Sequence, residues 1–253
     1  MIIYGINPVL EALRAGRVKE LRVGERNSGR YLRVLSLAGE RGVHVRRVPV
    51  DTLDRDARGG VHQGVLAIVD DAHEHSIDDL VRDAREAPLL VVLDGIEDPH
   101  NLGAILRTVD AAGADGVVMQ SRRSAALGGA AAKASAGAVA HVRIAEVVNI
   151  ARALDELKEA GVWTVGLAGE AEMSYDKMDF TGPIAIVLGA EGTGLRRLVR
   201  ERCDYLVGIP MRGHVGSLNV SVAAGVTLFE AVRQRGQQPN DRDSRTRRLR
   251  SEH

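Results

Sequence analysis

Residues 209–225 read IPMRGHVGSLNVSVAAG, a loop broken by glycines that runs directly into an apolar helix. Three small polar residues, Ser217, Asn219 and Ser221, stand at the junction. The first N–H groups of a helix lack partners within the helix, so such a junction can hold a polar ligand against backbone amides. A capped helix after a loop would explain the same residues. The stretch indicates a ligand site only if other loops of the chain also place small polar residues and glycines next to a helix.

The composition indicates a chain with a substantial core and no global charge. Its 253 residues suffice for one large domain or two modest ones. The 34 basic residues (Lys and Arg) equal the 34 acidic ones, so any nucleic-acid surface must be local. Residues 1–60 carry a net charge of +5 and residues 61–88 a net charge of −5. A basic segment before an acidic linker fits an RNA-facing module, and it fits ordinary solvated surface charge as well.

Several classes of protein are excluded or disfavoured. The single cysteine, Cys203, excludes an internal disulfide and a cysteine cage for a metal. His73 and His75 lie two residues apart without a third ligand nearby, so we expect no metal. No run approaches the ~18 uninterrupted apolar residues of a membrane span, and no signal-peptide pattern opens the chain. We expect a soluble, cytoplasmic protein.

The hydrophobic pattern predicts two α/β domains. Residues 1–70 form a small domain in which Asn7 caps a helix with Pro8 at its first position, and 61–69 are its last, buried strand. Residues 71–87 are an acidic linker with one short helix. Residues 88–235 alternate strands and helices, as a mostly parallel sheet requires. The polar tail, 236–253, is expected to be disordered.

Three loops leave the carboxyl ends of expected parallel strands, where open α/β sheets bind ligands. The first loop leads into the motif N-x-G-x-x-x-R-T, which begins at Asn101. In a helix, Arg107 lies about 140° around the axis from Leu102, so its side chain is off the apolar stripe. The second, GAEGTGL at 189–195, sets Glu191 between glycines that let the backbone pass close to a ligand. The third is the stretch 209–225.

Other ligand-binding motifs do not fit these loops. The loop 189–194 has neither the Lys-Ser/Thr of a Walker loop nor the spacing of a dinucleotide-binding fingerprint. No G-x-S-x-G elbow surrounds Ser217, which argues against a serine hydrolase.

Together the loops resemble the three motifs of the SpoU (TrmH-like) branch of the SPOUT RNA methyltransferases: N-x-G-x-x-x-R-T, L-G-x-E-G-x-G-L and I-P-M-x-G-x-x-x-S-L-N-V-S-V-A. Further short stretches are similar to the bacterial group that methylates guanosine 2′-oxygens in 23S rRNA: Tyr4-Gly5, Asn7, His62-Gln63-Gly64 and Phe229-Glu230-Ala231. The resemblance covers residues 1–235.

This resemblance implies S-adenosylmethionine as methyl donor and a 23S rRNA guanosine, in the P loop of the peptidyl-transferase centre, as acceptor. It implies a SPOUT catalytic domain with a trefoil knot and an N-terminal, ribosomal-protein-like domain that binds the RNA substrate. It also implies a homodimer with the active site close to the interface. Gly225 would then allow close backbone packing where the chain threads its knot.

The resemblance also assigns roles to individual residues. The catalytic positions that it implies are Asn101, Arg107, Glu191, Ser217 and Asn219. The backbone positions that would hold the adenosyl group are Leu167, Gly169, Gly189, Ile209 and Leu218. An arginine side chain keeps its proton in water near neutral pH, so we expect Arg107 to hold a phosphate and to stabilise the developing alkoxide, and the base is left open. Residues 127–130 depart from the family's pattern. This departure affects the expected rigidity of a substrate-binding loop and leaves the expected chemistry unchanged.

Two alternatives stay open at this point. A tRNA or antibiotic-resistance rRNA ribose methyltransferase would perform the same chemistry on another substrate. An RNA-binding ribosome-assembly factor without catalysis belongs to a different class, and the intact motif residues argue against it. The N-terminal domain argues against the common tRNA enzyme, which is shorter at that end.

Overall fold

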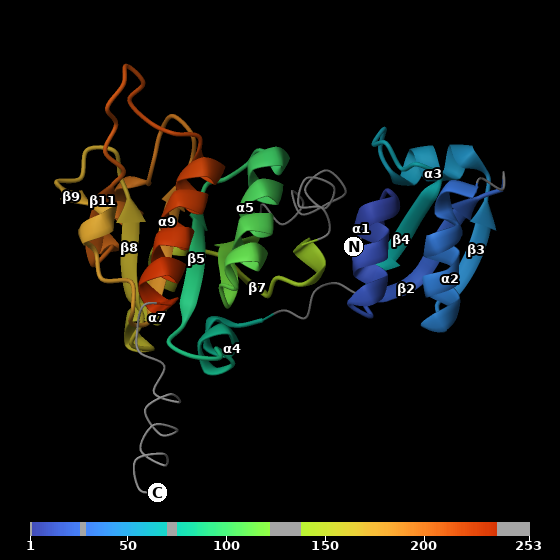
Figure 1. Ribbon diagram of the computed structural model, residues 1–253, viewed down its shortest axis with the longest axis horizontal. Helices are drawn as coiled ribbons and strands as arrows, with labels where there is room; N and C mark the ends of the chain where they lie inside the picture. The colour runs from blue at the N-terminus through green and yellow to red at the C-terminus, as the bar shows by residue number, and fades with distance from the viewer. Residues whose placement is uncertain (1, 26–28, 70–74, 122–137, 237–253) are drawn as a thin grey trace, which may run out of the picture.

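The computed structural model describes residues 2–25, 29–69, 75–121 and 138–236 and contains two α/β units that follow one another along the chain (Figure 1). The smaller unit holds a four-stranded sheet, and the larger one holds a seven-stranded sheet. Residues 127–130 lie outside the described residues, and so does the tail from 237 on. The sequence predicts disorder over 236–253, but Gly236 is the last residue of a helix.

The smaller unit has the strand order β1-β4-β2-β3. Its strands are β1 (Ile2–Tyr4), β2 (Val18–Gly24), β3 (His44–Val48) and β4 (Val65–Val69). Its helices are α1 (Ile6–Arg14), α2 (Leu32–Glu40), preceded by a 3-10 turn, and α3 (Val50–Asp56). Strands β2 and β3 are parallel, whereas β4 runs antiparallel to both β1 and β2. Helices α1 and α2 bury Leu13 and Val34 against one face, and α3 buries Leu53 against the other.

Helix α1 begins at Ile6, and the prediction that Asn7 caps it was wrong. Gly5 precedes the helix at a φ of 93° and offers no capping side chain. The N–H of Ile6 instead donates to Oε1 of Gln63 at 3.0 Å, across 57 positions of sequence. Gln63 has a φ of 54° in a turn, so β4 begins at Val65 and not at 61. A tertiary hydrogen bond thus replaces the local cap that the sequence suggested.

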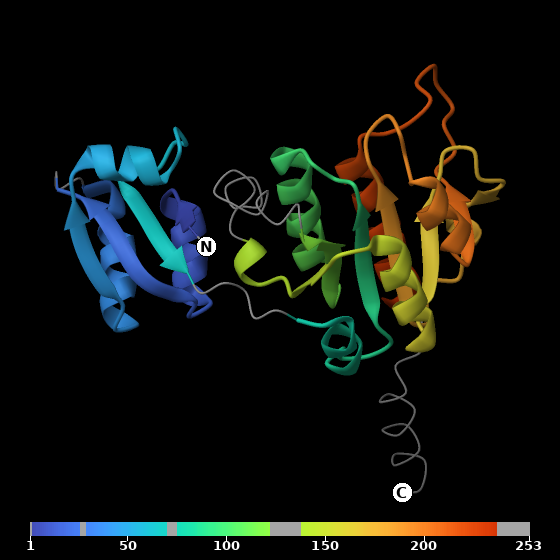
Figure 2. The ribbon, with the colours of Figure 1, turned by 180° about the vertical axis from the view of Figure 1, so that it is seen from behind.

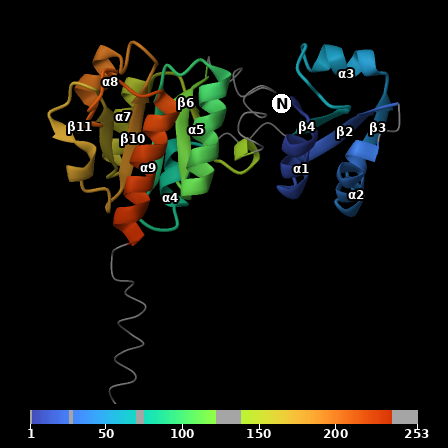
Figure 3. The ribbon, with the colours of Figure 1, turned by 45° about the horizontal axis from the view of Figure 1, so that its top comes forward.

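The larger sheet is parallel throughout, with the order β7-β6-β5-β10-β8-β11-β9. Its strands are β5 (Leu89–Asp94), β6 (Gly116–Gln120), β7 (Ile144–Val147), β8 (Trp163–Leu167), β9 (Met173–Ser174), β10 (Ile184–Gly189) and β11 (Tyr205–Gly208). Helices α5 (Pro99–Ala112) and α9 (Val220–Gly236) lie side by side on one face (Figure 1). Helices α4 (Ile77–Arg82), α7 (Ile150–Glu159) and α8 (Arg197–Arg202) cover the other face (Figures 2 and 3). The loops that follow β5, β8, β10 and β11 therefore meet at one edge of the sheet.

The strand order departs from the chain order at two places. Strand β10 lies between β5 and β8, and β11 lies between β8 and β9. After β11 the chain returns to the middle of the sheet, where α9 packs on α5 and on the central strand β10. A trefoil knot needs crossings of this kind, although connection rules make knots a rare outcome. The knot itself stays a prediction.

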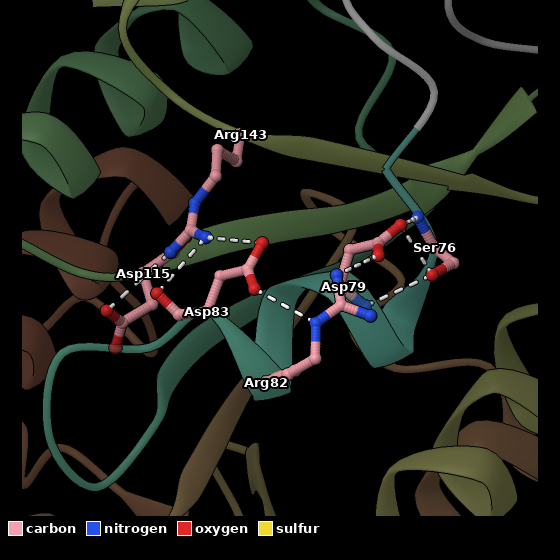
Figure 4. Close-up of polar contacts among 6 residues, drawn as sticks. All are labelled: Ser76, Asp79, Arg82, Asp83, Asp115 and Arg143. Atoms are coloured by element: carbon pink, nitrogen blue, oxygen red, sulfur yellow. Dashed lines mark hydrogen bonds and ion pairs between the residues drawn. The ribbon is translucent and has the colours of Figure 1, made fainter.

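Helix α4 lies within the stretch expected to be a linker, but it packs against the larger unit. Its Ile77 and Leu80 are buried in the same core cluster as Leu154 of α7. Ser76 Oγ accepts the N–H of Asp79 at 3.1 Å, and the Asp79 carboxylate accepts the N–H of Ser76 at 2.9 Å (Figure 4). Hydrogen bonds from the backbone and hydroxyl of Ser76, and then from Arg82, lower the pKa of Asp79 to about 2.

Arg143 ties the end of α4 to the start of β6 (Figure 4). Its Nε donates to the carbonyl oxygen of Asp115 at 3.0 Å, and its Nη1 donates to that of Asp83 at 3.3 Å. The backbone of His75 also forms a parallel β-bridge with Ala145, a residue of β7. The larger unit thus includes the chain from His75 onward.

Gly225 in α9 faces α5, and close packing does not require a glycine there. A Cβ built on Gly225 would lie 3.9 Å from Cγ2 of Thr108, which is an ordinary contact. Gly225→Ala is therefore expected to raise the free energy of unfolding by about 0.5–1 kcal/mol, because alanine loses less backbone freedom in a helix. Urea unfolding measures the change. A loss of stability would show that the space beside Thr108 must stay empty.

Candidate active site

The loops at the carboxyl edge of the larger sheet enclose a cleft of about 500 Å³. Its walls are the end of β8 with residues 168–170, the end of β10 with residues 190–195, and the start of α9 with the residues before it, namely Val207, Ile209, Met211 and 216–218. The volume lies within the roughly 300–1,000 Å³ that is typical of small-molecule sites. Seven residues singled out in the sequence line this cleft: Leu167, Gly169, Gly189, Glu191, Ile209, Ser217 and Leu218.

Glycines shape the cleft by letting backbone segments approach one another. A Cβ on Gly189 would lie 2.2 Å from the carbonyl carbon of Gly194, because the loop after β10 folds back over its own strand. Gly194 closes this loop through two hydrogen bonds with Ala190, of 3.1 and 2.8 Å. Gly192 and Gly194 have φ values of 76° and 67°, which favour glycine. These contacts give the loop a tight turn, and Glu191 lies at that turn.

Asn219, the residue before α9, is the centre of a polar network. Its Nδ2 donates to Oδ1 of Asn101 at 3.0 Å and to Oε1 of Glu191 at 2.5 Å. Its Oδ1 accepts the N–H of Ser221 at 2.9 Å and the hydroxyl of Ser221 at 2.6 Å. The second pair of hydrogen bonds starts α9 as a helix cap does. One amide side chain thus joins the first, second and third motifs.

A second cavity, of about 310 Å³, adjoins the cleft. It is lined by residues 95–98, by Asn101, and by Ala190, Glu191, Thr193 and Val220, and these last four also line the cleft. Asn101 is buried, and Glu191 is exposed to both spaces. Glu191 therefore lies where a molecule in one cavity would meet a molecule in the other, whereas Asn219 lines neither cavity and contacts Glu191 from beside them.

The structure does not bring Arg107 to this network within one chain. Arg107 follows Asn101 by six residues on α5, which separates the two by about 9 Å along the helix and about 120° around it. Its side chain is exposed and lines neither cavity. Ser217 lines the cleft beside Leu218 and faces solvent.

Sequence reasoning missed three groups next to the cleft. Glu170 and Arg200 form an ion pair in its wall, but neither lies in a motif that would have drawn attention. Asp94 is completely buried below it. A signal for Asp94 existed, because a carboxylate ends the otherwise apolar run LLVVLD of β5.

Other chemistries find no support in the part of the chain that the structure describes. Burial raises the pKa of the Cys203 thiol to about 12, so the thiol stays protonated. Among residues 2–25, 29–69, 75–121 and 138–236, no three His, Cys, Asp or Glu side chains gather as metal ligands would. No helix in these ranges has the length and apolar character to cross a membrane.

Two family models match the chain. Residues 88–229 match the SpoU rRNA methylase family, and residues 2–75 match the domain described as RNA 2′-O ribose methyltransferase substrate binding. The first match contains all three motifs, and the second covers the smaller unit.

Relatives and solved structures agree with these matches. The chain is 48% identical to a 23S rRNA (guanosine-2′-O-)-methyltransferase, RlmB, of Pseudomonas syringae pv. tomato, over 92% of this chain and 95% of that one. It is 49% identical to an RlmB of Xylella fastidiosa, over 92% and 96%. The crystal structure of the SpoU methyltransferase AviRb from Streptomyces viridochromogenes with AdoMet superposes with a TM-score of 0.78 at 28% identity, over 93% and 90%.

Proposed function

The chain belongs to the SpoU rRNA methylase family, and we propose that it transfers a methyl group from S-adenosylmethionine to the ribose 2′-hydroxyl of a guanosine in 23S rRNA. One observation carries the assignment of the site. Glu191 lines both the cleft and the second cavity, Asn101 lines the second cavity, and Asn219, which lines neither, hydrogen-bonds to both side chains. A donor in the cleft would therefore meet an acceptor in the cavity at Glu191, which Asn219 holds in place.

The cleft fits S-adenosylmethionine. The apolar side chains of Leu167, Ile209 and Leu218 offer contacts for the faces of an adenine ring. The turn at Gly169 and the end of β10 at Gly189 offer backbone groups to its polar edge. Gly189 tolerates no side chain, which keeps this wall made of backbone. The bound cofactor supplies a methyl group that its sulfonium has already activated.

The protein's task is then to align the acceptor, because a 2′-hydroxyl is a poor nucleophile. We assign Asn219 to hold Glu191 and Asn101 in fixed positions around the acceptor, and Ser217 to order the loop beside the cofactor. The transfer would leave S-adenosylhomocysteine in the cleft, and the proton of the 2′-hydroxyl would pass to solvent. We assign Arg107 to an RNA phosphate and to the developing negative charge, since a guanidinium binds both in a fixed geometry.

We propose that the active form is a homodimer built on the face of α5 and α9. Val222 and Phe229 are seven residues apart on α9, so they share one side of the helix, and each is 50% exposed. An apolar stripe of this kind is suited to a second copy of the chain. Arg107 is exposed on the neighbouring helix α5, so a dimer on this face would bring Arg107 towards the interface.

Phe229→Glu is expected to convert the dimer to a monomer and to lower methyl transfer at least tenfold, because a charge in an apolar interface loses its hydration. Light scattering coupled to size-exclusion chromatography measures the mass. Val148→Glu is the control, since Val148 is 77% exposed on β7's side of the larger unit, away from α9. A wild-type protein that is monomeric at assay concentration would contradict the proposal.

We propose that the smaller unit binds the RNA substrate. The positive charge of residues 1–60 and the match of residues 2–75 to a substrate-binding domain support this role. We also propose that the methylated guanosine lies in the P loop of the peptidyl-transferase centre and that the protein works in the cytoplasm, where ribosomal RNA is found.

Methyl transfer in vitro tests the reaction. Purified protein, methyl-labelled S-adenosylmethionine and 23S rRNA are expected to give 2′-O-methylguanosine after nuclease digestion. Bulk tRNA is the comparison acceptor. Label in tRNA alone would favour the tRNA enzyme, and binding of RNA without any transfer would favour a non-catalytic assembly factor.

A further inference from the structure

Asp94 is a buried carboxylate whose contacts go to a single residue far along the chain. Its exposed fraction is 0%, at the last position of β5. Oδ2 of Asp94 accepts the backbone N–H of Arg196 at 2.8 Å, and Oδ1 accepts from Nε and Nη2 of Arg196, each at 2.5 Å. A buried carboxylate is costly unless it is paired in this way. The pair therefore fixes where Arg196 lies.

Arg196 ends the loop that carries Glu191. The loop leaves β10 after Gly189, turns at Gly192 and Gly194, and enters α8 at Arg196, whose carbonyl accepts the N–H of Arg200 at 2.9 Å. Gly189 is paired in register with Asp94 in the β5–β10 ladder. The backbone of Asp94 thus holds the start of the loop, and its side chain holds the end.

The loop forms a wall shared by both cavities. Ala190, Glu191 and Thr193 line the cleft and the second cavity alike. A shift of the loop would also move Glu191 away from Nδ2 of Asn219, which it contacts at 2.5 Å. Neither Asp94 nor Arg196 lines either cavity.

We propose that Asp94, through Arg196, is a positioning residue for the methyl-transfer site. It sets the loop 189–196 and so places Glu191 and the backbone wall of the cofactor cleft. The inference rests on the proposed function for its kinetic consequence. The anchoring of the loop itself can be tested without cofactor or RNA.

Arg196→Met is the principal test, because it removes the half-exposed guanidinium and leaves the buried Asp94 carboxylate with only the backbone N–H of residue 196. A loss of stability is expected, so urea unfolding sets the conditions under which the variant is compared. The dissociation constant for S-adenosylmethionine is expected to rise, and the single-turnover rate at saturating cofactor to fall, by about ten- to a hundredfold, because small misplacements at a reacting centre have effects of this size. Arg196→Lys keeps one donor group, so its dissociation constant and its rate are expected to lie between those of wild type and Arg196→Met. Measurements are made where circular dichroism shows every variant folded.

Arg197→Met is the matched control. Arg197 is the next residue, its side chain is 75% exposed, and it pairs with Glu201 one turn along α8. Both constants are expected to stay at wild-type values in this variant. Asp94→Asn combined with Arg196→Met is expected to be no worse than the more damaging single variant, because the two residues act as one unit. Additive effects would contradict the coupling.

Hydrogen exchange separates this inference from the proposed function. The amides of residues 192–195 are expected to exchange faster in Arg196→Met than in wild type or Arg197→Met, in protein without ligand. Unchanged exchange together with wild-type binding and rate would overturn the proposal. If wild type bound no S-adenosylmethionine, the proposed function would fail, and the exchange result would still decide whether Asp94 and Arg196 anchor the loop.

Discussion

Asn219→Ala is expected to lower the rate of methyl transfer by about 10²- to 10³-fold, the loss seen when one positioned hydrogen-bond group is removed from an active site. The substitution removes both hydrogen bonds from Nδ2, to Asn101 at 3.0 Å and to Glu191 at 2.5 Å. The first, second and third motifs then lose the side chain that joins them. Single-turnover transfer to 23S rRNA at saturating cofactor measures the effect.

The control must account for the helix cap that Asn219 also provides. Asn149 caps α7 by accepting the N–H of Arg152 at 3.2 Å, and α7 covers the face of the sheet opposite to α9. Asn149→Ala is expected to lose about 1 kcal/mol of stability, as Asn219→Ala does through its cap, and to keep the wild-type rate. Equal rates in the two variants would remove Asn219 from the mechanism.

Arg235→Ala is expected to lower the free energy of unfolding by about 3 kcal/mol, because one guanidinium holds four backbone carbonyls. Its Nη1 donates to Ala87 at 2.6 Å, and its Nη2 donates to Gly182 at 2.7 Å and to Pro88 at 3.2 Å. Its Nε donates to Phe180 at 3.0 Å. The last turn of α9 thus ties the start of β5 to the segment before β10.

Urea unfolding, followed by the fluorescence of the single tryptophan, measures this loss. Arg152→Ala serves as the control, since Arg152 is 80% exposed and pairs with Glu156 on the surface of α7. Its expected cost is below about 0.5 kcal/mol. A similar cost for both variants would show that water satisfies the carbonyls that Arg235 contacts.

The order of strands and helices along the larger unit could be predicted because periodicity and strand composition are local. The buried run 89–93 became β5, and the apolar spacing after Asn101 became α5. The sheet order could not be read this way, since placing β10 between β5 and β8 depends on contacts distant in sequence. The cap of α1 shows the same limit, because Gln63 replaces the expected Asn7.

The candidate site was reached through the motifs and not through periodicity. Leu167, Gly189 and Ile209 belong to different strand ends, and parallel pairing brought them around one cleft. The role of Asn219 as the common donor could not be read from sequence, because it requires distances. The motif assigns Arg107 to the active site, but within one chain its side chain is exposed and lines neither cavity. The proposed dimer is our physical explanation for this difference.

The most direct test of the central claim is a map of ribose 2′-O-methyl groups in 23S rRNA from cells with the gene, without it, and with the Asn219→Ala allele. We expect one guanosine to lose its methyl group without the gene, to regain it with the wild-type allele, and to stay unmethylated with Asn219→Ala. A map that is the same in all three strains would contradict the account.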